Sequence, residues 1–166
     1  MWPSIIILGF VTLQRLAELV IARRNTRALM ARGAREIGAD HYPVMVALHA
    51  SWLAGLWFLA PGHPVQPIWL TLFVVLQLGR LWVLATLKGR WTTRIIVLPG
   101  ASLVREGPYR LLSHPNYAVV IGEIAVLPLA FNMPLYAGIF SIFNGLMLWL
   151  RISVENRALK TAMFLK

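Results

Sequence analysis

The stretch that decides the fold is residues 118–150, AVVIGEIAVLPLAFNMPLYAGIFSIFNGLMLWL. It contains two apolar runs, Ala118–Phe131 and Pro134–Leu150, which are joined only through Asn132-Met133-Pro134. Asn and Pro this close together are typical of a tight turn. Because a bilayer offers backbone groups no partner except one another, apolar runs are predicted to be helices. We therefore predict a short helical hairpin formed by the last two membrane spans.

Three further apolar runs precede this hairpin, and a transmembrane helix needs about 20 such residues. The chain of 166 residues is 58% hydrophobic and only 13% charged, with a mean hydropathy of +0.68. A soluble domain of this size cannot bury so much apolar surface. The prediction is an all-α integral membrane protein, a single membrane domain over residues 1–166 with about five transmembrane helices. The earlier runs are Trp2–Ala22, Pro43–Ala60 and Val65–Leu87.

Charge sets the expected orientation. Arginine and lysine are concentrated in the loops 22–42 and 88–116 and in the tail that begins at Arg151, whereas the turns at 61–64 and 132–134 carry no charge. Cytoplasmic loops carry an excess of Lys and Arg. The sequence thus predicts an outside N-terminus and a cytoplasmic C-terminus.

The formal net charge of +10 raises the question of a nucleic-acid partner. The charges are dispersed among apolar spans, so contact with anionic membrane lipids is the simpler interpretation, and no nucleic-acid partner is expected. The absence of cysteine excludes disulfides and thiolate chemistry. His41, His49 and His63 are too scattered for a metal site, and none is predicted. No oligomeric state is indicated.

Four charges lie inside the spans: Arg15, Glu18, Arg80 and Glu123. Intramembrane charges are expensive and normally face partners or a watery cavity. Arg15 and Glu18 are three residues apart and either pair on one helix face or extend toward the interface. For Arg80 and Glu123 we expect a polar cavity open to the inner leaflet.

The densest group of polar and special residues is 98–123, LPGASLVREGPYRLLSHPNYAVVIGE. Pro99-Gly100 and Gly107-Pro108 are predicted turns. Pro115 suits the first position of a helix. His114 and Asn116 then stand at a helix N-terminus, which favours a carboxylate or phosphate.

This segment resembles the isoprenylcysteine carboxyl methyltransferase family, membrane enzymes that use S-adenosylmethionine. The shared pattern is Gly107-Pro108-Tyr109, then His114-Pro115-Asn116-Tyr117, then Arg151 with Glu155 four residues later. The family commonly doubles the acid, whereas Asn156 stands at the second position here. The resemblance implies a methyltransferase-like half at 78–166 and leaves 1–77 as N-terminal helices.

The resemblance also implies roles for individual residues. Arg151, Glu155 and His114 would be catalytic, and Arg151 would also bind the substrate, while Arg94 is a weaker cofactor candidate because its residue type differs from the family's. Glu123 and Arg80 are further substrate-binding candidates, not from the resemblance but because these intramembrane charges fit the same location. The residues implied in S-adenosylmethionine binding are Leu103, Val104, Tyr109, His114, Pro115, Asn116, Tyr117 and Glu155.

Elementary chemistry agrees with these roles. Arg151 and Glu155 share one helix face, and a guanidinium there can hold an anionic acceptor oxygen. A carboxylate or acidic enol is already ionised and needs no strong base. A phenol, with a pKa near 10, would need help from His114 or Glu123.

Three classes of function remain open. The segment Trp91–Gly100 resembles short bacterial family members that O-methylate alkylpyrones or alkylresorcinols, which favours a lipidic small molecule over a prenylcysteine carboxylate. The protein would then lie in a bacterial inner membrane with its active site facing the cytoplasm. The alternatives are a lipid-amine N-methyltransferase or an NADPH-dependent sterol-reductase-like protein, and a non-enzymatic membrane scaffold.

Overall fold

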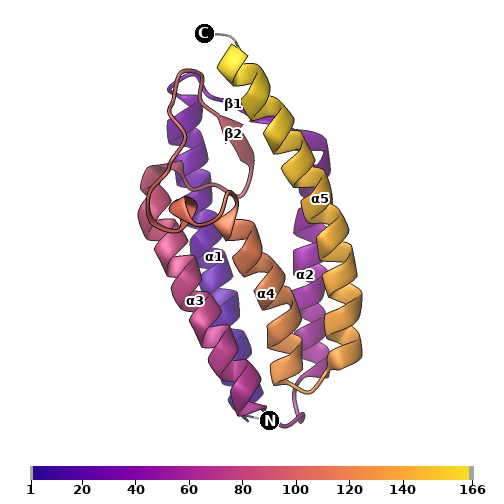
Figure 1. Cartoon of the computed structure of the whole chain (residues 1–166). Coiled ribbons are helices and arrows are strands. Elements are labelled where there is room, and N and C mark those ends of the chain that lie inside the picture. The colour runs from indigo at the N-terminus through magenta and orange to yellow at the C-terminus, as the bar shows by residue number, and fades with distance from the viewer. Residues whose placement is uncertain (1, 165–166) are drawn as a thin grey trace.

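Five α-helices run roughly along one direction in the computed structural model of the chain, which describes residues 2–164 and the side chains of residues 2–158 (Figure 1). The helices are α1 (Trp2–Met30), α2 (Tyr42–Leu59), α3 (Pro67–Leu87), α4 (Pro115–Ala130) and α5 (Pro134–Phe164). Short 3-10 turns lie at Ala39–His41 (η1), Lys88–Arg90 (η2) and Gly107–Arg110 (η3).

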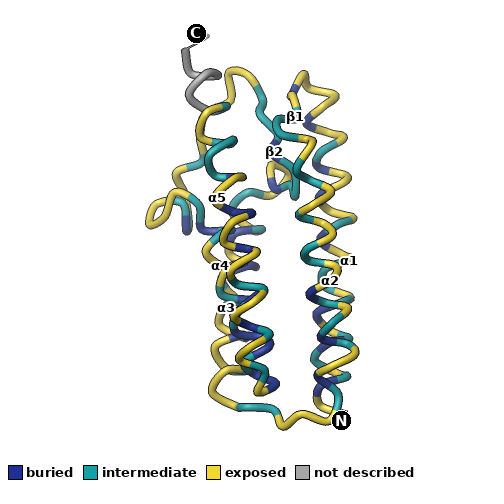
Figure 2. Tube along the Cα trace, turned by 90° about the vertical axis from the view of Figure 1, so that its right-hand side faces the viewer, coloured by how far each residue is buried: buried dark blue, intermediate teal, exposed yellow. Residues whose placement is uncertain are grey.

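The five helices differ in whether they are long enough to span a membrane. Among the described residues, four helical segments are long and apolar enough to cross a bilayer: Trp2–Met30, Ala39–Leu59, Pro67–Arg90 and Pro134–Ala158. The fourth helix, α4, has 16 residues, or about 24 Å of helix against a hydrocarbon core of about 30 Å. The protein is an integral membrane protein, and the count of five spans stays a prediction. Figure 2 shows the exposed positions that run along the outside of the helices, where lipid would lie.

The first and last helices extend further than hydropathy predicted. Beyond Ala22, α1 continues through Arg23, Arg24 and Arg27 to Met30. Beyond Leu150, α5 continues to Phe164. Arg, Ala and Leu are good helix formers, so the backbone stays helical after the sequence stops being apolar.

The structure is mostly helical, as an all-α membrane protein should be, and it adds one small element that the sequence analysis did not predict. Two three-residue strands, β1 (Arg35–Ile37) and β2 (Ile95–Val97), pair antiparallel with Glu36 opposite Ile96. They form a small ribbon at the end of the molecule where α5 terminates (Figure 1). The ribbon connects the α1–α2 loop to the α3–α4 loop and contacts α5. We call this end of the bundle the ribbon end.

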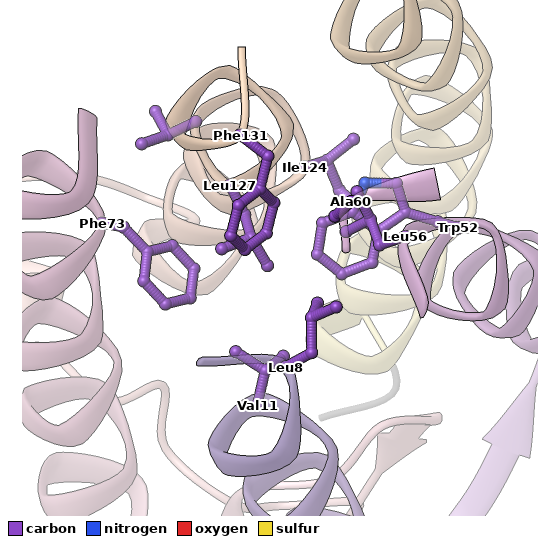
Figure 3. Packing of buried hydrophobic residues seen from close by; sticks show 10 residues of the cluster. Leu8, Val11, Trp52, Leu56, Ala60, Phe73, Ile124, Leu127 and Phe131 are labelled. Carbon is purple, nitrogen blue, oxygen red and sulfur yellow. The ribbon is translucent and has the colours of Figure 1, made fainter. Parts of the chain in front are cut away.

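The main apolar core occupies the opposite half of the bundle. Figure 3 shows side chains from α1, α2, α3 and α4 meeting there, with Trp52 and Phe131 the largest that are fully buried. A smaller cluster of Ala22, Val83 and Trp91 lies nearer the ribbon end. The elements that carry polar residues at the ribbon end are thus anchored on apolar packing below them. The labelled members of the main core are Leu8, Val11, Trp52, Leu56, Ala60, Phe73, Ile124, Leu127 and Phe131.

Candidate functional site

The N-terminus of α4 brings the predicted histidine and tyrosine against α5. His114 is the N-cap of α4 and Pro115 its first residue, as the sequence predicted. The Tyr117 hydroxyl donates to Glu155 Oε2 at 2.7 Å, and His114 Nδ1 lies 3.8 Å from the same oxygen. The rings of His114 and Tyr117 stack with centroids 5.4 Å apart. Three residues separated in sequence therefore meet between α4 and α5.

Arg151, one helical turn before Glu155 on α5, is the fourth residue of this cluster. Its side chain is buried at 4% exposure, and its Nη2 donates to the backbone oxygen of Thr93 at 3.0 Å. Its guanidinium carbon lies 6.0 Å from the centroid of the Tyr117 ring. Arg151 and Glu155 share one face of α5, but Arg151 binds Thr93 and Glu155 binds Tyr117. The two charged side chains are therefore held by other partners rather than by an ion pair with each other.

Two buried polar atoms on the helices that form the cluster lack a hydrogen bond among the residues whose side chains are described. They are Arg151 Nε, a donor, and Asn116 Oδ1, an acceptor in the first turn of α4. Buried polar groups are nearly always paired, and an unpaired one is a candidate for a functional role.

Tyr109 lies just outside the cluster, half-buried against the apolar group of Ala22, Val83 and Trp91. Burial, and secondarily the negative charge of Glu155, raises the pKa of Tyr109 to about 12. The phenol therefore stays protonated at neutral pH and is a hydrogen-bond donor there. It lies within the electrostatic reach of Glu155, and its cofactor contact stays a prediction.

The ribbon supplies contacts that sequence reasoning missed. Thr93 positions Arg151 through its carbonyl oxygen and accepts or donates a 3.0 Å hydrogen bond with the Tyr42 hydroxyl. Arg94 binds Glu36 at 2.6 Å and lies 4.1 Å over the Tyr42 ring, so its charge is engaged within the ribbon. The β-branched run Ile95-Ile96-Val97 was the one sequence signal for this element.

Leu103 and Val104 lie elsewhere at the ribbon end. They line a cleft between the end of α1 and the turn after α3, where arginines predominate. Among the described residues no side-chain hydrogen bond joins them to Glu155, and their cofactor role remains a prediction.

Arg80 and Glu123 do not line an open polar cavity. Their exposures are 3% and 0%, and Arg80 holds Glu123 with two hydrogen bonds, the Nε bond measuring 2.8 Å. Gln77 donates to Glu123 at 2.7 Å. Pairing satisfies these charges without water, which explains why the expected cavity is absent here.

Arg15 and Glu18 belong to the same network. Arg15 donates to Glu18 at 3.0 Å, as the spacing suggested, and to Glu123 at 2.6 Å. Arg80 reaches Glu18 at 3.1 Å. Two arginines and two glutamates thus form a closed group that links α1, α3 and α4, and the predicted substrate role of Arg80 and Glu123 stays untested.

These features define the class of protein: a helical integral membrane protein with a polar site between two helices at one end of its bundle. Residues 69–161 match the isoprenylcysteine carboxyl methyltransferase (ICMT) family. The match covers more than half of the chain, and the chain belongs to this family of membrane methyltransferases.

One relative extends the likeness to nearly the whole chain. It is a Bacillus subtilis (strain 168) protein described as uncharacterized protein YpbQ, 38% identical over 160 residues, which cover 93% of this chain and 95% of the relative. No solved structure matches the chain.

Proposed function

We propose that this protein transfers a methyl group from S-adenosylmethionine to an oxygen of a lipidic small molecule, at the cytoplasmic leaflet of a bacterial membrane. The observation that carries the proposal is the cluster of His114, Tyr117, Arg151 and Glu155. These are residues of the family pattern, and they come together in space from α4 and α5.

The open polar atoms of the cluster fit this cofactor and an anionic acceptor. S-adenosylmethionine carries amino and carboxylate groups, and when bound it supplies an activated methyl on a positively charged sulfur. Asn116 Oδ1 offers an acceptor to its N–H groups. The Glu155 carboxylate, held by Tyr117, offers a negative charge to the cationic cofactor.

Arg151 is the group that would hold the methyl acceptor. Thr93 occupies its Nη2 and fixes the guanidinium plane. Nε is buried without a partner among the described side chains and would be the donor to an anionic oxygen that enters the site. Methyl transfer depends mainly on aligning nucleophile, methyl and sulfur, so a rigid guanidinium is well suited to the task. An acceptor that is already ionised needs no general base.

A lipid tail has an apolar approach to this site. Leu111 and Leu112, just before His114, are 75% and 53% exposed. These two apolar side chains lie next in sequence to the polar cluster. They support a lipidic acceptor such as an alkylpyrone or alkylresorcinol, with a prenylcysteine carboxylate as the second candidate.

Cofactor binding by the purified full-length protein tests the proposal. Calorimetric titration should detect S-adenosylhomocysteine, the product form, and Glu155→Gln should weaken its binding by about tenfold or more, because a charge-assisted hydrogen bond is lost. Asp40→Asn makes the corresponding change at an exposed acid and should leave the affinity unchanged. Binding of NADPH but not S-adenosylhomocysteine would favour the reductase-like alternative and refute the methyltransferase.

A further inference from the structure

A second polar feature of the ribbon end is a basic cleft of about 650 Å³. It lies between the end of α1, the turn η2 after α3, and the loop 102–106. Five cations line it against one carboxylate. These residues, which define the basic cleft, are Arg24, Arg32, Lys88, Arg90, Arg105 and Glu106.

Hydrogen bonds hold the walls of the basic cleft in place. Asn25, itself buried, donates to the carbonyl oxygens of Lys88 at 3.1 Å and Trp91 at 2.8 Å. Lys88 adopts a left-handed backbone, φ 49°, which Asn25 thereby fixes. Arg90 donates to the carbonyl oxygen of Ser102 at 2.7 Å and ties the loop to the turn. The cations are thus gathered by the fold itself.

Charge argues against the methyl donor as the occupant. A cofactor with a positively charged sulfur is repelled by a cleft with four cations in excess. A phosphate group is the anion that clustered Arg and Lys side chains bind best.

The position of the basic cleft along the spans indicates which kind of molecule would carry the phosphate. The basic cleft lies at the ends of the spans Trp2–Met30 and Pro67–Arg90, where lipid headgroups reside. A smaller hollow lined by Val20, Arg23, Arg24 and Arg27 adjoins it and shares Arg24. Val20 is 66% exposed, about one helical turn further into the span, and offers an apolar surface to an acyl chain.

We propose that the basic cleft binds the phosphate of an anionic phospholipid in the leaflet at the ribbon end. The headgroup lies between α1 and the loop 102–106, and the tails run down the outside of α1. The basic cleft does not include Tyr117 or Glu155, and the proposal stands independently of methyl transfer at that cluster. Because Leu103 and Val104 line the cleft, a lipid phosphate there conflicts with the cofactor role that the family resemblance implies for these two residues.

Native mass spectrometry of the full-length protein, without methyl donor, tests the assignment. Phosphatidylglycerol should be retained at least about tenfold over phosphatidylcholine with the same chains. Each basic residue near the surface contributes about a fivefold factor, so Arg32→Gln with Arg105→Gln should lower this preference by about tenfold or more. Arg35→Gln with Arg110→Gln removes the same charge from exposed sites outside the cleft and should leave the preference intact.

Three outcomes would overturn the proposal. The first is that the parent protein shows no preference for phosphatidylglycerol over phosphatidylcholine. The second is an equal loss of this preference in the control variant, which would mean that diffuse surface charge holds the lipid. The third is equally tight binding of glycerol phosphate, which would assign the cleft to a soluble ligand.

Discussion

Tyr117 is the residue through which the candidate site is organised. Its hydroxyl binds Glu155, its ring stacks on His114, and Arg151 lies on its ring face. One aromatic side chain in the first turn of α4 thus contacts each residue assigned a catalytic role. The alignment of these groups follows from the packing of α4 on α5.

Replacing Arg151 by lysine should separate catalysis from cofactor binding. Lysine keeps the charge but not the planar fork that Thr93 and the acceptor share. We expect the rate of methyl transfer to fall by about tenfold or more, with affinity for S-adenosylhomocysteine changed by less than about threefold. Rates and affinities of the same preparation give both values, and an equal loss of the two would contradict the role assigned to Arg151.

The phenol of Tyr109 should ionise at a higher pH than an ordinary tyrosine. Its pKa in the folded protein is about 12 against about 10 unfolded, because burial and Glu155 disfavour the charged form. Its contribution to stability is complete below pH 10 and is lost as the pH rises toward 12. At pH 11, the tyrosinate absorbance of folded Tyr109→Phe should therefore differ little from that of the parent. A large deficit in the variant would show that Tyr109 ionises normally.

The proximity of His114, Tyr117, Arg151 and Glu155 was predictable because these residues belong to one sequence pattern, whereas their roles stay predictions. Thr93 was not predictable, since it acts through a backbone oxygen that any residue type could supply.

At the scale of elements, the buried ionic network joins three helices. Glu123 on α4 accepts from Arg15 on α1 and from Arg80 on α3. Its burial leaves no water to replace a lost partner. The network therefore fixes the register of α4 against its neighbours, and through α4 the position of His114 and Tyr117.

Removing Glu123 alone should cost much more than removing a matched pair. Glu123→Leu leaves the buried Arg80 and the partly exposed Arg15 with one carboxylate and should lower the free energy of unfolding by about 3–5 kcal/mol. Arg80→Leu together with Glu123→Leu leaves Arg15 paired with Glu18, so the loss should be smaller than for Glu123→Leu alone. Reversible unfolding in mild detergent measures both, and additive losses would refute the coupling.

Hydropathy located the helices but not their ends. The apolar runs found α2 and α3 closely, because these helices end where the sequence turns polar. Hydropathy missed the last turns of α1, where Asn25 and Leu29 are buried although the neighbouring sequence is polar. The ribbon was not predicted because its strands have only three residues each and because they pair residues far apart in the chain, such as Arg35 and Val97.

At the scale of the molecule, the charge distribution predicts the orientation in the membrane. The chain has no cysteine, so single cysteines can be introduced cleanly. Ser102→Cys, at the ribbon end, should react with an impermeant maleimide only after cells are permeabilised. His63→Cys, exposed in the turn between α2 and α3, should react in intact cells. The reverse pattern would place the site outside and contradict the positive-inside rule.

The whole account depends on the α4–α5 cluster being a methyl-transfer site. The most direct measurement is incubation of the purified protein with S-adenosylmethionine labelled in its methyl group and a panel of alkylpyrone, alkylresorcinol and prenylcysteine acceptors. The account predicts label in at least one lipidic acceptor, and loss of that label in Glu155→Gln but not in the control variant Asp40→Asn. Labelling that persists undiminished in Glu155→Gln would contradict it.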